Sequence, residues 1–394
     1  MKKKIVLSIF IILISFLQNS CGSKRISKKI IVASSGKIES LDPARANTLK
    51  AIQLISSLGD TLYELNSEGE LIPELASGMP VISKDRLQIT INLRKNVFFH
   101  DGTAFNSNAM KFTFDRFKRI GTMNYILGNK IKSIETPSEY SVIINLNKPS
   151  SSLNGLLTSV NLTPISPKFY KQYSDKFLNE KFVGTGKYVL TSFSNEVQSI
   201  DPYLNYWGEK PLNNGVNFVG YSNSSSLFGA LKSKQIDVLL SNSIDDSQRK
   251  SLNNLSKNKQ FNEGNSPFIE LSFISLKTSS YPLNNLNLRL ALAKSLNRKL
   301  ISEKVSYGLR KPSRSIIPPI LKKDNQELWP KYDYLEARRL LQKENYCNGN
   351  ILKIPLTYRS NVPADKLIAL TWQEEIKTLL KDCIDIEING VESK

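Results

Sequence analysis

The hydrophobic positions along this chain alternate between the period of a β-strand and that of an α-helix. Apolar and polar residues alternate from Leu87 to Leu93, which predicts a strand with one buried face. Apolar residues recur every three positions from Leu49 to Leu58, which predicts a helix. The same pattern predicts strands at residues 29–34, 141–146, 187–193, 216–221, 236–240, 268–277, 352–358 and 385–391, and helices at residues 107–119, 224–232, 288–300 and 364–380, with another helix after a capping box at Asp333 and Glu336.

The order of these elements predicts an α/β protein built from two blocks. The final strand, helix and strand form a β-α-β unit, which implies a parallel pair with a right-handed crossover. Residues 245–265 are rich in Asn, Lys and Ser, and we interpret them as a linker. A β-rich stretch is inserted in the first block. Two blocks joined in this way indicate two lobes around a cleft, the usual place for a ligand.

The amino terminus predicts export. Lys2–Lys4 precede the apolar segment Ile5–Leu17, which is shorter than the about 20 residues that span a bilayer. A basic start with a short apolar run predicts a signal peptide over residues 1–20. A small residue before Cys21 and a glycine after it resemble a lipoprotein signal, whose cysteine is acylated, although Gln18 replaces an aliphatic residue of that signal. We therefore expect a periplasmic, lipid-anchored protein outside the cytoplasmic membrane; a plain signal peptide with an incidental cysteine is the alternative.

The charge of the chain is strongly basic but scattered. The sequence has 54 Lys and Arg against 35 Asp and Glu, a formal net charge of +19. The basic residues are interleaved with Asn, Ser and Ile, without a run of five like charges. This scatter argues against a nucleic-acid partner, whereas a basic surface facing anionic lipid headgroups is compatible with it.

The sequence offers little that supports catalysis. The single histidine, His100, excludes Ser-His and Cys-His hydrolysis and any multi-histidine metal site. The segment Gly184–Lys187 has Lys181 and Tyr188 where a phosphate-binding loop requires Gly and Ser or Thr. We therefore predict that the protein is not an enzyme and has neither a metal site nor a cofactor.

Several segments, in the right order, resemble the family 5 extracellular solute-binding proteins of ABC importers. The strongest is LRKNVFFHDGTAFN at residues 93–106, beside the family's L-R-K-G-V-K-F-H-D-G-T-P-F-N. Asp101–Thr103 independently predict a turn between a strand and a helix, which gives His100 a structural place at that turn. Further similar segments are LDP at 41–43, PELA at 73–76, VGTGKY at 183–188, YWG at 206–208, RLALAKSLNR at 289–298, and Tyr332-Asp333 with Ala337, Leu340 and Leu341.

The resemblance implies a two-lobed periplasmic-binding-protein-like fold of the class II type with an inserted β-rich subdomain. It divides the chain into a signal peptide at 1–20, a tether at 21–28, a lobe I core at 29–48 and 183–266, an inserted subdomain at 49–182 and lobe II at 267–394. Family members usually continue well beyond the last residue given. The resemblance therefore implies that lobe II is incomplete, in a truncated form or a fragment.

The resemblance also implies a transport function. A solute is captured in the cleft, the lobes close, and the closed form docks on an ABC permease and, through it, its ATPase subunits. Peptides are the expected ligands, because the family pairs mainly with their backbone. Nickel or a metal chelate is less favoured, since one structural histidine leaves no protein ligand set. An envelope scaffold or sensor that has lost transport is the alternative class. We expect a monomer.

The family pattern implies a set of ligand-binding residues. An aromatic residue precedes the family's D-T-L, but this chain has Gly59 there, so a stacking surface is lost or moved. The expected ligand-binding residues are Leu41, Asp42, Gly59, Tyr63, Ser222, Phe273 and Tyr358.

The two remaining cysteines predict a disulfide. Cys347 lies just before the strand at 352–358, and Cys383 lies just before the strand at 385–391. In a β-α-β unit both positions fall at the same end of the parallel pair, where strands about 4.8 Å apart can bring two cysteines within bonding reach. An oxidising compartment would allow the bond to form, and two free buried thiols are the alternative.

Overall fold

The computed structural model describes residues 29–127, 129–150, 153–173, 176–240, 243–264, 271–313, 315–317, 328–360 and 362–391. The predicted signal peptide, the tether and Cys21 lie outside these residues. The chain divides into two compact units, unit 1 with Met1–Glu64, Leu71–Asn223 and Gly229–Leu239, and unit 2 with Leu65–Glu70, Ser224–Phe228 and Leu240–Lys394. The finer division into lobes and an inserted subdomain stays a prediction.

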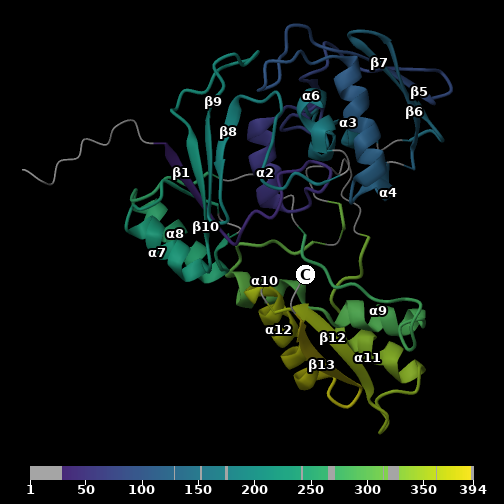
Figure 1. Ribbon diagram of the computed structural model, residues 1–394. Helices are drawn as coiled ribbons and strands as arrows, with labels where there is room; N and C mark the ends of the chain where they lie inside the picture. The colour runs from purple at the N-terminus through teal and green to yellow at the C-terminus, as the bar shows by residue number, and fades with distance from the viewer. Residues whose placement is uncertain are drawn as a thin grey trace, which may run out of the picture. The chain divides into compact units, whose positions relative to one another are not determined.

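Unit 1 contains a five-stranded sheet in the order β11-β1-β10-β9-β8 (Figure 1). Its strands are β1 (Ile30–Ser35), β8 (Tyr188–Phe193), β9 (Val197–Pro202), β10 (Val216–Tyr221) and β11 (Val238–Leu239). β1 is parallel to both β10 and β11, whereas β9 is antiparallel to β10 and β8. Helix α2 (Leu49–Leu58) buries Leu54, Ile55 and Leu58 in one core with Ile200 of β9 and Val216 of β10.

A second sheet of unit 1 is antiparallel, with the order β4-β5-β7-β6. Its strands are β4 (Val81–Ile82), β5 (Gln88–Asn92), β6 (Ile131–Ser138) and β7 (Ser141–Leu146), and helix α3 (Ser107–Ile120) shares their core (Figure 1). Ile89 and Ile91 are fully buried, as the alternation of residues 87–93 predicted. The smaller elements of unit 1 are β2 (Tyr63–Leu65), whose last residue is assigned to unit 2, β3 (Leu71–Pro73), α4 (Asn124–Leu127), α5 (Leu153–Leu157), α6 (Pro167–Tyr170) and the 3₁₀ turns η1 (Val160–Leu162) and η2 (Lys171–Tyr173).

Unit 2 is built on the predicted β-α-β arrangement. Strands β12 (Leu352–Arg359) and β13 (Ile384–Val391) are parallel, with Leu352 opposite Ile384, and α12 (Pro363–Leu379) connects them. One core joins the two strands to α12 and to two further helices, α9 (Leu286–Ser295) and α11 (Tyr334–Lys343) (Figure 1). The remaining helices are α8 (Asp246–Lys257), α10 (Arg298–Ser306) and α7 (Ser224–Lys232), which is divided between the two units.

The linker predicted at residues 245–265 is wrong for most of its length. Residues 246–257 form helix α8, which begins at a complete capping box: the Asp245 carboxylate accepts a hydrogen bond from the backbone N–H of Gln248, whose side chain accepts one from the Asp245 N–H. These reciprocal bonds satisfy donors that a helix start otherwise leaves free. Capping, rather than an apolar stripe, therefore marks the start of this helix.

Two further predictions are corrected in unit 2. The helix expected over residues 288–300 is two helices, because α9 ends at Ser295 and Asn297 caps α10 by accepting a hydrogen bond from the Leu300 N–H. The strand expected over residues 268–277 is absent from 271–277, while 268–270 lie outside the described part. A run of alternating apolar residues does not suffice where no neighbouring strand pairs with it.

Candidate functional site

The loop after helix α2 lies against a glycine-rich segment of the same unit. The Gly59 N–H donates to Ile55 O at 2.9 Å and ends the helix, while the Gly186 N–H donates to Leu58 O at 3.0 Å. A Cβ on Gly186 would lie only 2.4 Å from the Gly59 nitrogen. Only glycine allows this approach of the two backbones, so the V-G-T-G sequence positions the Gly59–Thr61 loop.

Asp60 in this loop is a buried carboxylate with three side-chain donors. Thr185 Oγ1 and Trp207 Nε1 both donate to Oδ2 at 2.9 Å, and the Tyr206 hydroxyl donates to Oδ1 at 3.1 Å. Asp60 is 5% exposed. Burial raises its pKa, while the three hydrogen bonds and the positive charge of Lys187 oppose that rise.

Glu74, just after β3, is the second carboxyl of the site. Its Oε2 accepts a hydrogen bond from the Thr61 N–H at 2.9 Å and lies 3.1 Å from Thr61 Oγ1. Burial first, and then the nearby carboxyls of Asp60 and Glu64, together raise the pKa of Glu74 to about 9. Two carboxyls close together in a desolvated place do not both ionise readily, so this site can hold a proton at neutral pH.

Aromatic rings and basic side chains border the two carboxyls. The guanidinium of Arg94 lies 4.4 Å from the centre of the Trp207 ring, and its Nε donates to the backbone carbonyl of Glu74 at 2.9 Å. Lys187 Nζ lies 5.8 Å from the centre of the Tyr206 ring. These cation–π contacts hold positive charge beside the acids. The arrangement gathers polar and charged groups from five separate segments of unit 1 around the two carboxyls.

Leu41 and Asp42, two of the predicted ligand-binding residues, are fully buried in unit 1. Arg116 forms a bidentate ion pair with Asp42 at 2.8 and 2.6 Å, and the backbone N–H groups of Ala44 and Leu178 donate to the same carboxylate. Both carboxylate oxygens of Asp42 thus accept hydrogen bonds from protein donors. In this structure Asp42 is an ion-pair partner and Leu41 a core residue, and contact of either with a solute stays a prediction.

Gly59 and Tyr63 lie on either side of the Asp60 loop. A Cβ on Gly59 would lie 2.5 Å from Thr163 Cγ2 and 3.0 Å from Phe182 Cζ, so the space of a side chain is filled. Tyr63 is 0% exposed and donates its hydroxyl hydrogen to Gly78 O at 3.0 Å. Both residues are closely surrounded by protein atoms. Their contact with a solute stays a prediction.

Ser222, Phe273 and Tyr358 are more accessible. Ser222 is exposed in unit 1, Phe273 is 65% exposed in unit 2, and Tyr358 is half-buried on β12 opposite Gly390. The structure thus distributes the predicted residues over two units. Their joint use by one ligand stays a prediction.

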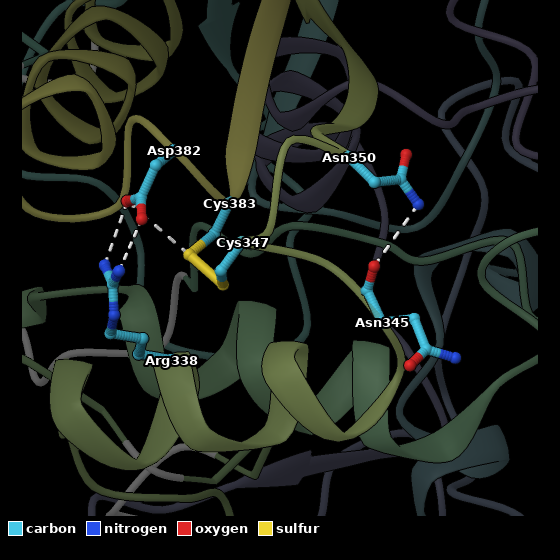
Figure 2. Close-up of a disulfide and its surroundings, with 6 residues drawn as sticks. All are labelled: Arg338, Asn345, Cys347, Asn350, Asp382 and Cys383. Carbon is cyan, nitrogen blue, oxygen red and sulfur yellow. Dashed lines mark hydrogen bonds and ion pairs between the residues drawn. A yellow bond between two sulfur atoms is a disulfide. The ribbon is translucent and has the colours of Figure 1, made fainter.

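The structure joins Cys347 and Cys383 in a disulfide, the pair indicated by the β-α-β arrangement (Figure 2). Cys383 is fully buried and Cys347 is 9% exposed. Next to the bond, Asp382 forms a two-point ion pair with Arg338 of α11 (Figure 2). The loop before β12 and the turn before β13 are therefore tied at one end of the parallel pair.

His100 has the structural place predicted for it at a turn. Its Nε2 lies 3.0 Å from Gly186 O, which can only accept, so Nε2 carries the hydrogen. The ring makes an edge contact with Tyr203, and its Nδ1 has no hydrogen-bond partner among the described residues. Burial lowers the pKa of His100, which favours the neutral ring.

Sequence reasoning missed Glu74, Arg94, Thr185, Tyr206 and Trp207 as site residues. Four of them stand in the segments PELA, VGTGKY and YWG, which were used only as marks of resemblance. The polar residues inside those segments were the sequence feature that could have indicated the site. What brings them together is long-range packing, which no local pattern reports.

Within the described ranges, His, Cys, Asp and Glu side chains nowhere gather in threes that could hold a metal ion. In the same part of the chain, no helix has the length and apolar character needed to cross a membrane.

Comparison with known structures defines the class of fold. NikA from Brucella suis, solved in complex with Fe(III)-EDTA, matches with a TM-score of 0.81 and 23% identity over 93% of this chain and 75% of that one. DppA from Helicobacter pylori, a periplasmic binding protein solved with the peptide STSA, matches with a TM-score of 0.74 and 24% identity over 93% and 74% of the two chains. The mixed α/β fold is thus that of periplasmic binding proteins, as predicted.

Sequence comparison then gives the family. The profile of the bacterial extracellular solute-binding proteins, family 5 (middle), matches residues 70–394. The glutathione-binding protein GsiB of Escherichia coli O6:K15:H31 (strain 536 / UPEC) is 27% identical over 353 residues, which are 88% of this chain and 67% of that protein. The chain belongs to the family 5 extracellular solute-binding proteins.

Proposed function

We propose that this protein captures a peptide for an ABC importer and delivers it to a membrane permease. The observation that carries the proposal is the family match over residues 70–394. The peptide assignment is supported by relatives: GsiB is named for glutathione, itself a tripeptide, and solved neighbours hold the peptide STSA and the dipeptide Met-Leu. This function requires only that the protein bind and release the peptide, without breaking a covalent bond.

The rival solute is a metal chelate. Neighbours of the same fold were solved with Fe(III)-EDTA and with Ni(L-His). A chelate carries most of its own metal ligands, so a protein cluster is not required for it. Peptide is favoured because the relative that matches over 88% of the chain is named for a peptide.

Lipid anchoring at Cys21 and docking on the permease complete the proposal. A lipid anchor keeps a binding protein near its permease and raises its local concentration there. The basic net charge of +19 supports a protein held close to anionic headgroups. A scaffold or sensor of the cell envelope would share the anchor but show no transport.

The test is a binding screen on the purified full chain. Thermal unfolding is followed with glutathione, a dipeptide mixture and Ni²⁺ with histidine, and molecules that co-purify are identified by mass spectrometry. A peptide at 100 times its Kd should stabilise the fold by about 2.7 kcal/mol. Stabilisation by the nickel complex alone, or by none of the solutes, would contradict the peptide assignment.

Matched variants locate the site. Phe273→Ala should weaken peptide binding, and Leu335→Ala serves as control, because both side chains lie in unit 2 and both are 65% exposed. Equal affinities of the two variants and the parent would remove Phe273 from the site.

A further inference from the structure

The loop between β9 and β10 carries the two most exposed leucines among the described residues. Leu212 is 100% exposed and Leu204 is 75% exposed. Between them, the Tyr206 hydroxyl and Trp207 Nε1 donate hydrogen bonds to the buried carboxylate of Asp60. The middle of the loop is thus fixed to unit 1, while the leucines on either side of it stay in water. Two such side chains on one fixed loop indicate a contact that covers them.

This loop ends where the first strand begins. The Ile30 N–H donates to Gly215 O at 3.0 Å, and a Cβ on Gly215 would lie 3.3 Å from Lys29 Cε. Leu212 stands three positions before Gly215. Strands β1 and β10 are parallel neighbours, so both start at this end of the sheet (Figure 1). The residues before Lys29 are therefore joined to unit 1 beside the β9–β10 loop.

The length of the tether limits how far this end of the sheet can be from a lipid anchor. Lys29 follows Cys21 by eight positions, which span at most about 29 Å when fully extended. Lys24, Arg25 and Lys28 make the tether basic, and it contains no acid. The anchor at Cys21 is part of the proposed function, and the present inference rests on it. Such an anchor holds the β9–β10 loop close to headgroups, and the basic tether favours anionic ones.

Exposed lysines occur at the same end of the sheet. Lys210 lies within the loop, and Lys187 precedes β8, which starts where the antiparallel β9 ends. Lys232 and Lys234 lie at the turn between α7 and β11, and β11 is parallel to β1. All four side chains are exposed. Their positive charge is complementary to anionic headgroups.

The acids at this end are fewer, and two of them are engaged within the protein. The Asp237 carboxylate accepts a hydrogen bond from the Ile31 N–H at 2.9 Å, and the Asp237 N–H donates to Ile31 O at 3.0 Å. Asp201 forms an ion pair with Lys29. Glu209 is exposed beside the loop lysine. Lysines therefore outnumber acids among the described residues at this end of the sheet.

We propose that the β9–β10 loop is a membrane-contact surface, at which Leu204 and Leu212 enter an anionic bilayer and Lys210 lies among the headgroup phosphates. Leucine side chains gain free energy by leaving water, and each lysine near an anionic surface adds to the attraction. The loop gives the anchored protein a second attachment and so restricts its orientation. Ser222, a predicted ligand-binding residue, follows the opposite end of β10, about 20 Å along the strand, so the contact leaves it uncovered.

A fluorescent label in the loop tests the contact. The full chain is reconstituted with vesicles of phosphatidylglycerol and phosphatidylcholine. Leu212→Cys carries a thiol-reactive fluorophore, which lipids brominated in their acyl chains quench where it enters the bilayer. Cys347 and Cys383 are joined in the disulfide, and the labelled parent serves as the blank. Val81→Cys is the control, because Val81 is 64% exposed on β4 in the other sheet of unit 1. We expect quenching at residue 212 and none at residue 81.

A charge substitution tests the anionic part of the proposal. Lys210→Gln should lower the ratio of quenched to unquenched label at residue 212 about fivefold, because one lysine is lost from the contact. Lys84→Gln, at an exposed lysine of the β4–β5 turn, should leave the ratio unchanged. Equal effects of these two substitutions would overturn the proposal.

The proposal would equally be overturned by an unquenched label at residue 212, by equal quenching at residues 212 and 81, or by protein that does not sediment with the vesicles. The vesicles contain no permease, so quenching identifies lipid as the partner, and an unquenched loop leaves a protein partner as its occupant. Because they also contain no solute, failure of the membrane contact and failure of the peptide function are distinguishable.

Discussion

At the scale of single residues, the buried charges of unit 1 are paired through long-range contacts. Asp42 and Arg116 are 0% and 2% exposed, and they lie 74 positions apart in sequence. The sequence marks Asp42 only as part of an L-D-P segment, which suggested a ligand contact. The sequence shows that a buried carboxylate needs a basic partner, but it does not show which Lys or Arg the fold brings to it. Glu74 and Trp207 escaped prediction for the same reason.

Asp42→Asn should strongly destabilise unit 1. Removing one member of a buried ion pair leaves the other charge uncompensated, at a cost of about 3 to 5 kcal/mol. Urea unfolding measures the loss. Asp115→Asn is the control: Asp115 pairs with Lys111 in the same helix as Arg116, but the side chains are 46% and 42% exposed, and about 0.5 kcal/mol is expected there. Equal effects of the two substitutions would show that the Asp42 pair carries no special weight.

At the scale of elements, most strands and helices could be predicted from the sequence. Helix α2 and strands β7 and β10 have the predicted bounds, because each places apolar residues at a clear period on a face that packs. Helix α8 was missed, since its sequence DSQRKSLNNLSK has no apolar stripe, although Asp245 and Gln248 carried a capping signature. Strand β6 (IKSIETPS) was missed because its pattern is broken by register shifts against β7.

The Cys347–Cys383 bond belongs to this scale, since it ties together the ends of two elements. The cysteines are 36 positions apart, so in the chain-entropy model the bond stabilises unit 2 by about 3 to 4 kcal/mol. The double variant Cys347→Ala, Cys383→Ala should lower the unfolding midpoint accordingly, whereas the parent in reductant serves as a second comparison. Counting thiols in denatured, unreduced protein checks the bond directly: two reactive thiols at these positions would disprove it.

At the scale of the whole molecule, family and fold class could be predicted because many short segments occur in the family's order. Which side chains contact a solute could not be predicted in the same way, because the residues expected there are scattered along the chain and no local pattern relates them. The expected ligand set therefore mixes packed residues such as Leu41 with exposed ones such as Phe273. Order along the chain identifies a family more reliably than it identifies a binding surface.

The proposed membrane anchor belongs to the scale of the whole molecule. Cys21→Ala should shift the protein from the membrane fraction to the soluble envelope fraction, because the residue proposed to be acylated is lost. Fractionation with immunoblotting measures the shift, and Ser27→Ala, further along the predicted tether, is the control. If the Cys21 variant stays with membranes as the parent does, the plain signal peptide is the correct interpretation.

The pairing of β1 has a kinetic consequence. Ile30 lies in register with Val216, and Val32 with Val238, so both neighbours of the first strand are made long after it along the chain. Contacts of such large separation slow folding, because much chain entropy is lost before they form. An emerging chain therefore carries β1 with both edges open until most of unit 1 has followed. Such a chain stays unfolded for most of its synthesis, so it can still pass through a narrow pore. During that time its open strand edges need protection from aggregation.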